Sequence, residues 1–156
     1  MARPEAGPAG RGSVPRAPMA VVAAGLWSGA SEFVRNEVLL PTVWRDHFAG
    51  LGLTFPAEPL NAAVWVVWSF VAAGVVFAVS RRFGLLATTA IAWVAAFPMM
   101  WLVTWNLAVL PLAVLPIAIP LSGLEAFGMA WLCLRLAPPN GGGGHGRVLA
   151  GPVGRG

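Results

Sequence analysis

The sequence predicts an all-α, polytopic integral membrane protein with four transmembrane helices in an antiparallel bundle and an extracytoplasmic interfacial segment between the first two helices. Of its 156 residues, 58% are hydrophobic and only 10% are charged, and the mean hydropathy is +0.75. Soluble domains carry about 25% charged residues, and a chain of this size has too little interior to bury so much apolar surface. The apolar residues gather in four stretches, each long enough to cross about 30 Å of hydrocarbon as a helix.

The first predicted span covers about residues 19–40. It follows a leader, residues 1–18, of Pro, Gly, Ala and Arg without periodicity. Because such a segment cannot bury enough apolar surface to fold, we expect it to be a disordered cytoplasmic leader. Pro41 closes the span, since proline removes a helical hydrogen bond.

A connecting segment, Thr42–Leu60, follows on the outer side. Its apolar side chains recur at helical spacing, at Trp44, Phe48 and Leu51. The polar residues among them face elsewhere: Arg45, Asp46 and His47. This pattern predicts an interfacial helix, in which we interpret His47 as an anchor of the outer connection that could also sense external pH.

The second predicted span covers about residues 61–79 and ends at the turn that holds Arg81 and Arg82. The third begins directly after this turn and covers about residues 84–105. Two Arg residues in so short a turn fix the side of the membrane on which it lies.

The fourth predicted span covers about residues 111–136 and completes a transmembrane domain over 19–136. Its first half holds Pro111, Pro116 and Pro120. The Gly-rich remainder, residues 137–156, is expected to be a disordered cytoplasmic tail.

The distribution of arginine predicts the orientation. Arg45 alone falls on the outer side of this arrangement, whereas eight Arg residues fall on the other: Arg3, Arg11, Arg16, Arg81, Arg82, Arg135, Arg147 and Arg155. The positive-inside rule therefore places both termini in the cytoplasm. Five Trp residues cluster toward the outer face, where we interpret them as interfacial anchors: Trp44, Trp65, Trp68, Trp101 and Trp105. The use of Arg without any Lys, with abundant Ala, Gly and Pro, indicates GC-rich codons and predicts a bacterial inner membrane.

An alternative reading of the N-terminal region is a secretory signal. Basic residues, an apolar stretch and the small residues Ser28, Gly29 and Ala30 resemble a cleavage site. The apolar pattern resumes beyond Ala30, which favours a retained span.

Several partner classes are excluded by composition. The net charge of +4 is spread over tails and loops without a basic stripe, so no nucleic-acid partner is expected. The single cysteine, Cys133, excludes an internal disulfide and a Cys-based zinc site, and with only two histidines we expect no metal and no cofactor. The lipid bilayer is the expected partner, and a homo-oligomer or another membrane protein stays open.

Ionisable residues within the spans are the main functional clue. Glu32, Arg35 and Asn36 lie in the first span and Glu125 in the last. Eight Leu, Val and Phe residues favour insertion of the first span by roughly 2.5 to 5 kcal/mol, whereas Glu32 and Arg35 cost about 2.5 to 3.5 kcal/mol apiece. We therefore expect these charges to be neutralised by each other and by another helix.

Helical periodicity predicts which of these side chains meet. At 100° per residue, Glu37 points away from one shared side of the first span, formed by Ser28, Ser31, Glu32, Arg35 and Asn36. If the first and last helices are antiparallel, Glu32 and Glu125 lie at similar depth and Arg35 can bridge them. We further expect Asn106, at the outer end of the third span, to cap this site.

Three interpretations of the buried charges stay open. Arg35 is a structural partner that pins the register of the bundle, or one carboxyl without a cationic partner carries a proton or binds a cation, or the region holds a lipid. The corresponding functions are a non-catalytic or accessory membrane bundle, which we favour, and a proton-coupled transporter that works as an oligomer with Glu32 or Glu125 as proton carrier. An intramembrane enzyme or lipid-binding protein is the third, although no recognisable catalytic spacing is present.

Overall fold

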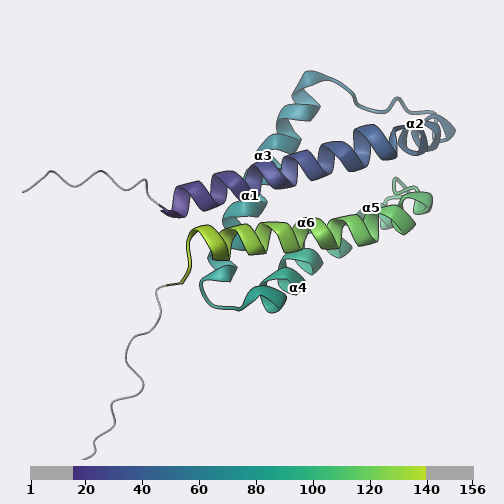
Figure 1. Cartoon of the computed structure of the whole chain (residues 1–156). Coiled ribbons are helices and arrows are strands. Elements are labelled where there is room, and N and C mark those ends of the chain that lie inside the picture. The colour runs from purple at the N-terminus through teal and green to yellow at the C-terminus, as the bar shows by residue number, and fades with distance from the viewer. Residues whose placement is uncertain (1–15, 140–156) are drawn as a thin grey trace, which may run out of the picture.

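The computed structural model describes residues 16–139, and all regular structure in this range is helical (Figure 1). The elements in chain order are α1 (Arg16–Phe33), the π-helical segment η1 (Val34–Leu39), α2 (Pro41–Gly50), α3 (Pro59–Ser80), α4 (Leu85–Ala96), α5 (Pro98–Asn106), the 3₁₀ turn η2 (Leu112–Val114) and α6 (Leu115–Leu136). Most of the predicted leader and tail, residues 1–15 and 140–156, lie outside the described residues.

Four helical stretches are long and apolar enough to cross a membrane, as the sequence predicts: Arg16–Leu39, Pro59–Ser80, Leu85–Asn106 and Leu112–Leu136. The first begins at Arg16, three residues before the predicted start at Met19. Pro18 is compatible with this earlier start because proline is tolerated in the first turn of a helix.

The surface of the helices is apolar and their contacts are made by small residues. Large side chains such as Leu60 and Leu86 are 74% and 78% exposed. The buried core between the helices consists mainly of small side chains, including Ala24, Ala73, Ala92, Ala126, Ala130 and Cys133. An apolar exterior with small residues at helix contacts is typical of helices packed in lipid.

Helix α6 contacts α1, α3 and α4, and α1 also packs on α3. In Figure 1, α1 and α6 lie side by side, while α3 crosses α1 obliquely. At that crossing a Cβ on Gly25 would lie 2.6 Å from the Phe70 ring, so the close approach of α1 and α3 requires glycine there. The N-terminal end of α1 and the C-terminal end of α6 lie on the same side of the molecule.

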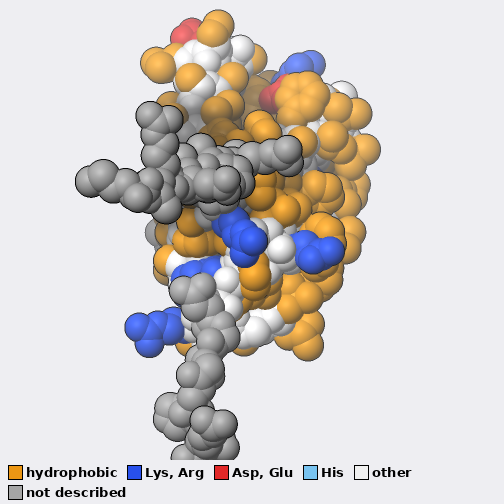
Figure 2. Space-filling view, turned by 60° about the vertical axis from the view of Figure 1, so that its left-hand side comes forward, with side chains coloured by type: hydrophobic (Ala, Val, Ile, Leu, Met, Phe, Trp, Pro, Cys, Tyr) orange, Lys and Arg blue, Asp and Glu red, His pale blue; other side chains and the backbone are white. Residues whose placement is uncertain are grey.

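Basic side chains gather at that end of the molecule (Figure 2). Four arginines of the described range belong to elements that end there: Arg16 at the start of α1, Arg81 and Arg82 in the turn between α3 and α4, and Arg135 in the last turn of α6. The helix walls beyond them are largely hydrophobic in the same view.

Two breaks divide otherwise continuous spans. Pro98 separates α4 from α5, because proline has no N–H to donate to the carbonyl four residues earlier. Phe97, at this break, is fully buried. At the end of the first span, η1 replaces regular α-helix and Leu40 leads into α2.

Helix α2 lies within the segment predicted to be interfacial and has no fully buried residue. Its apolar side is covered by Phe55, whose ring centroid lies 6.2 Å from that of Trp44 and 5.3 Å from that of Phe48. Arg45 and Asp46 are exposed, as the periodicity predicts, but His47 is half-buried. His47 follows Trp44 by three positions and therefore shares its side of the helix.

Candidate functional site

A buried polar cluster joins the first and last spans. We define it as Ser28, Glu32, Arg35 and Asn36 of α1 and η1 with Glu125 of α6. Ser28 and Glu125 are 0% and 1% exposed, and Glu32 and Arg35 are 6% and 4% exposed. The structure thus brings together the four ionisable or amide side chains that the sequence singled out inside the spans, Glu32, Arg35, Asn36 and Glu125.

Arg35 is the centre of this polar cluster. Its Nη1 donates to Glu125 Oε2 at 2.9 Å, and its Nη2 donates to Glu32 Oε1. One guanidinium therefore bridges a carboxylate on its own helix and one that lies 90 residues further along the chain. The two N–H groups use the fork geometry that lysine lacks.

The remaining carboxylate oxygens also have donors. Ser28 Oγ lies 2.7 Å from Glu125 Oε1, and Asn36 Nδ2 lies 2.7 Å from Glu32 Oε2. Each of the four carboxylate oxygens thus has one hydrogen-bond partner within the protein. This satisfies the rule that buried polar groups are hydrogen-bonded.

Trp44 extends the network from the core to α2. Its indole Nε1 donates to Asn36 Oδ1 at 3.0 Å, while Asn36 Nδ2 donates to both the backbone carbonyl and the carboxylate of Glu32. We predicted Trp44 to be an interfacial anchor only. Its N–H makes it a positioning residue for Asn36 as well.

The π-helical segment η1 carries Arg35 and Asn36. A π turn contains an extra residue per hydrogen-bonded ring and is frequent at functional sites. It changes the direction of the side chains that follow, relative to a regular α-helix. Nothing in the residue spacing of the sequence indicates it.

Aromatic side chains enclose the guanidinium. The Arg35 Cζ lies 5.2 Å from the ring centroid of Phe97, within the range of a cation–π interaction. The rings of Trp68 and Trp101 pack around Phe97, each with centroids 6.1 Å from it. Both Trp residues are predicted to be interfacial anchors, and in the structure both are half-buried with their rings against Phe97.

Two further indole groups link neighbouring helices to α6, and neither contact is among the predictions made from the sequence. Trp27 Nε1 donates to the backbone carbonyl of Glu125 at 3.1 Å, and Trp93 Nε1 donates to Ser122 Oγ at 2.8 Å. A usable signal existed for the first of these, because Gly128 follows Glu125 by less than one turn and leaves room for a large ring. A Cβ at Gly128 would overlap the Trp27 indole nitrogen.

Three secondary candidates lie outside the polar cluster. Glu37 is exposed, in agreement with its predicted direction. Asn106 is exposed at the end of α5 and is not a hydrogen-bond partner of the cluster, so the predicted cap is not formed. His47 lies in α2, where its Nε2 is buried without a hydrogen-bond partner among the described residues.

The formal charge of the cluster depends on one proton. Two ionised carboxylates and one guanidinium sum to −1, whereas one protonated carboxyl makes the sum zero. A net charge in so buried a site is unfavourable, because the free-energy cost of removing the charges from water can exceed the Coulombic attraction to a single partner.

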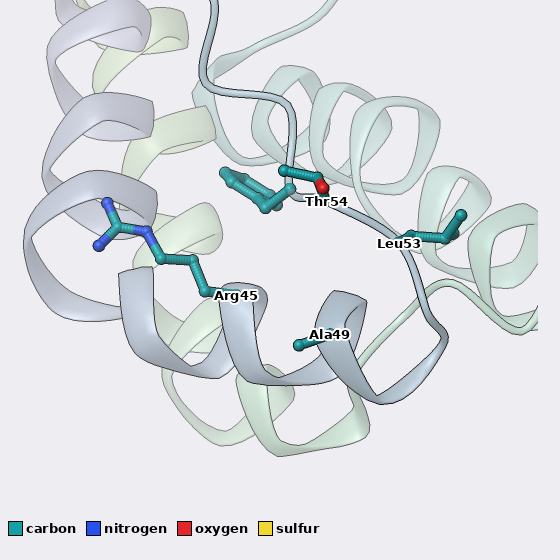
Figure 3. Close-up of a pocket in the computed structure, with 5 residues that line it drawn as sticks. Arg45, Ala49, Leu53 and Thr54 are labelled. Carbon is teal, nitrogen blue, oxygen red and sulfur yellow. The ribbon is translucent and has the colours of Figure 1, made fainter.

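Two open hollows lie away from the cluster. One of about 260 Å³ is next to Trp131 and Arg135 at the Arg-rich end of the molecule. The other, about 390 Å³, lies beside α2 (Figure 3) and is lined by Arg45, Ala49, Leu53, Thr54 and Phe55. In Figure 3 the Arg45 guanidinium extends away from Leu53 and Thr54, so this hollow has no convergent set of polar groups.

Comparison with known proteins gives no match to a family model, to a curated protein or to a solved structure.

Proposed function

We propose that the protein is a non-catalytic membrane bundle whose first and last spans are fastened together by the polar cluster. The observation that carries this proposal is the position of Arg35, which bridges Glu32 and Glu125 across the contact between α1 and α6. Every carboxylate oxygen of the cluster is engaged, and neither of the two hollows described above is lined by a cluster residue. A buried network in which every carboxylate oxygen has a hydrogen-bond partner supports a structural role better than a substrate site.

In this proposal the four spans form an antiparallel bundle in a bacterial inner membrane. Both ends of the described chain and the turn between α3 and α4 then face the cytoplasm, supported by Arg16, Arg81, Arg82 and Arg135 at one end of the molecule. The opposite end carries Arg45 together with three acids, Glu37, Asp46 and Glu58. Lipid is the partner of the apolar walls, and a second copy or another membrane protein can pack on them as well.

Labelling with a membrane-impermeant thiol reagent tests this topology. In a Cys133→Ser background, Arg82→Cys and Glu58→Cys each place one thiol at an exposed position. We expect only the Glu58→Cys protein to be labelled from outside intact cells and the Arg82→Cys protein only after permeabilisation. Labelling of both from the same side contradicts the proposed topology.

The fastening role predicts a loss of stability when Arg35 is removed. Arg35→Gln leaves two carboxylates without their shared cation, and breaking a buried ion pair costs about 3 to 5 kcal/mol. Thermal unfolding in detergent measures this loss. Glu37→Gln is the matched control, because Glu37 is in the same helical segment but exposed. Equal stability of the Arg35→Gln and control proteins contradicts a fastening role.

A second candidate function is proton-coupled transport by an oligomer of this protein. It is favoured by one observation, the presence of two carboxylates for one guanidinium, which makes the cluster neutral only when it holds a proton. In liposomes with an imposed pH gradient, this function predicts a proton-linked flux that Glu125→Gln abolishes while folding is retained. Absence of flux from folded wild-type protein in such liposomes contradicts transport and leaves the fastening role intact.

A further inference from the structure

We propose that the polar cluster is a binding site for a single proton, with Glu125 Oε1 as the atom that binds it and Ser28 Oγ as its hydrogen-bond acceptor. The proposal deepens the proposed function, since it rests on the network that Arg35 forms between α1 and α6. The four carboxylate oxygens differ in the group that each one faces, and only Glu125 Oε1 faces a group that can accept a hydrogen bond.

Two of the four oxygens face the guanidinium. Glu125 Oε2 and Glu32 Oε1 each accept an N–H of Arg35. A guanidinium has donors only and stays charged in proteins. A proton on either oxygen would therefore find no hydrogen-bond acceptor in the group that the oxygen faces.

The third oxygen, Glu32 Oε2, faces the amide of Asn36, whose orientation is fixed by Trp44. An indole N–H can only donate, and Trp44 Nε1 lies 3.0 Å from Asn36 Oδ1. Asn36 therefore presents its NH₂ group to Glu32, where Nδ2 lies 2.7 Å from Oε2. Both oxygens of Glu32 thus meet donors that cannot act as acceptors, and Glu32 stays ionised.

The fourth oxygen, Glu125 Oε1, faces a hydroxyl. Ser28 Oγ is 2.7 Å away and fully buried. A hydroxyl rotates and can donate or accept, and the distance suits an O–H···O bond in either direction. When Glu125 is ionised, Ser28 donates to Oε1. When Glu125 is protonated, its own O–H donates to Ser28 Oγ and no other contact of the cluster has to change.

No other charge in the described spans competes for this balance. Helix α1 and η1 bring Glu32 and Arg35 to the site, and their other charged residues, Arg16 at the start of α1 and Glu37 in η1, are exposed. Helices α3, α4 and α5 contain no charged residue. The remaining charges of α6 and its neighbours, Arg81, Arg82 and Arg135, lie at the turn between α3 and α4 and in the last turn of α6. Binding consists of transfer of a proton from hydronium to Oε1: one O–H bond of hydronium breaks, one O–H bond forms at Oε1, and a neutral water molecule is released.

The two glutamates should therefore respond differently to replacement by glutamine. In Glu125→Gln, the new amide oxygen accepts from Arg35 and its NH₂ group donates to Ser28, so the variant imitates the protonated state. In Glu32→Gln, the NH₂ group must face a donor of either Arg35 or Asn36. We expect Glu125→Gln to keep the thermal midpoint of the full-length protein in detergent, and Glu32→Gln to raise its unfolding equilibrium constant about tenfold or more.

Infrared spectroscopy of the reconstituted full-length protein provides an independent readout. We expect the C=O stretching band of a buried protonated carboxyl in wild type and in Glu37→Gln, and its loss in Glu125→Gln. In Ser28→Ala, the band should shift, because its hydrogen-bond acceptor is removed. Persistence of the same band in Glu125→Gln overturns the assignment, as does an equal change of stability in the Glu125→Gln and Glu32→Gln proteins. The stability of Arg35→Gln tests the fastening role separately, because it depends on the ion pairs of Arg35 and not on which oxygen binds the proton.

Discussion

Trp27 of α1 lies directly over Gly128 of α6, and the indole N–H at this contact donates to the backbone carbonyl of Glu125 at 3.1 Å. Trp27 can occupy this position only because residue 128 is glycine, since any side chain there would overlap the indole ring. The contact adjoins the polar cluster, where Ser28, the neighbour of Trp27, meets the carboxylate of the same glutamate.

Gly128→Ala is therefore expected to destabilise the protein by about 1 to 3 kcal/mol, the usual cost of overpacking a core. Gly123→Ala provides the control in the same helix, because no atom lies within 4 Å of a Cβ placed there. Alanine at position 123 should be neutral or slightly stabilising, given its higher helix propensity. Thermal unfolding in detergent compares the two, and a loss of similar size in both would rule out the packing explanation.

Trp44→Phe should loosen the amide of Asn36. The substitution keeps an aromatic ring near Phe55 but removes the N–H that fixes the amide orientation, at a cost of about 1 kcal/mol. Trp105→Phe is the matched control, because Trp105 is 59% exposed and donates no side-chain hydrogen bond within the described range. We expect the Asn36 side-chain amide to exchange faster in Trp44→Phe than in Trp105→Phe, as measured by NMR. Indistinguishable exchange in the two proteins would show that Trp44 does not hold the amide.

Phe97→Leu should weaken the surroundings of Arg35. It removes a cation–π contact worth about 2 kcal/mol when desolvated and the ring on which Trp68 and Trp101 pack. We expect a lower thermal midpoint together with altered tryptophan fluorescence. Phe83→Leu changes an exposed ring in the turn after α3 and should leave both unchanged. A variant at 97 with wild-type midpoint and fluorescence would contradict the role of this ring.

Arg81→Gln should fray the end of α6. Arg81 lies over the Phe77 ring, 4.4 Å from its centroid, and donates to the backbone carbonyls of Cys133 and Ala137. The last carbonyls of a helix have no partner within the helix, so a cation there stabilises the terminus by about 0.3 to 1 kcal/mol. Hydrogen exchange in the last turn of α6 should accelerate in Arg81→Gln and stay unchanged in Arg82→Gln, whose side chain is exposed. Equal exchange in both variants would contradict the capping role.

The four spans and the residues of the polar cluster could be predicted from the sequence, because unpaired backbone groups and unpartnered charges are both strongly unfavourable in lipid. Long apolar stretches have few stable states other than helices in lipid, and charges inside them must find partners. The angular spacing of Glu32, Arg35 and Glu37 was sufficient to separate the two buried residues from the exposed one. It could not show the π turn of η1, which depends on how the end of the first span packs rather than on a residue pattern.

The aromatic surroundings of the cluster were out of reach for a different reason. Trp44, Trp68 and Trp101 lie near the ends of apolar stretches, where tryptophan is typical of interfacial anchors. Only the crossing of the helices decides whether an indole faces lipid or a neighbouring ring. For Asn106 the sequence predicted a contact that the structure does not contain. Its position at the outer end of the third span suggested that it caps the polar cluster, but Pro98 begins a separate helix, α5, and Asn106 is exposed at the end of it. Pairing across helices depends on rotation about each axis, which one sequence does not determine.

The 90 residues between Arg35 and Glu125 impose a delay during synthesis. At about 5 to 20 residues per second, the ribosome needs roughly 5 to 20 s to produce the second glutamate after the arginine. Throughout that interval the nascent first helix has only its own Glu32 to compensate the charge of Arg35, and the second carboxylate is added only when α6 has been made. A truncated chain that ends before α6 would leave the same helix permanently without its distant partner and exposed to quality-control proteases.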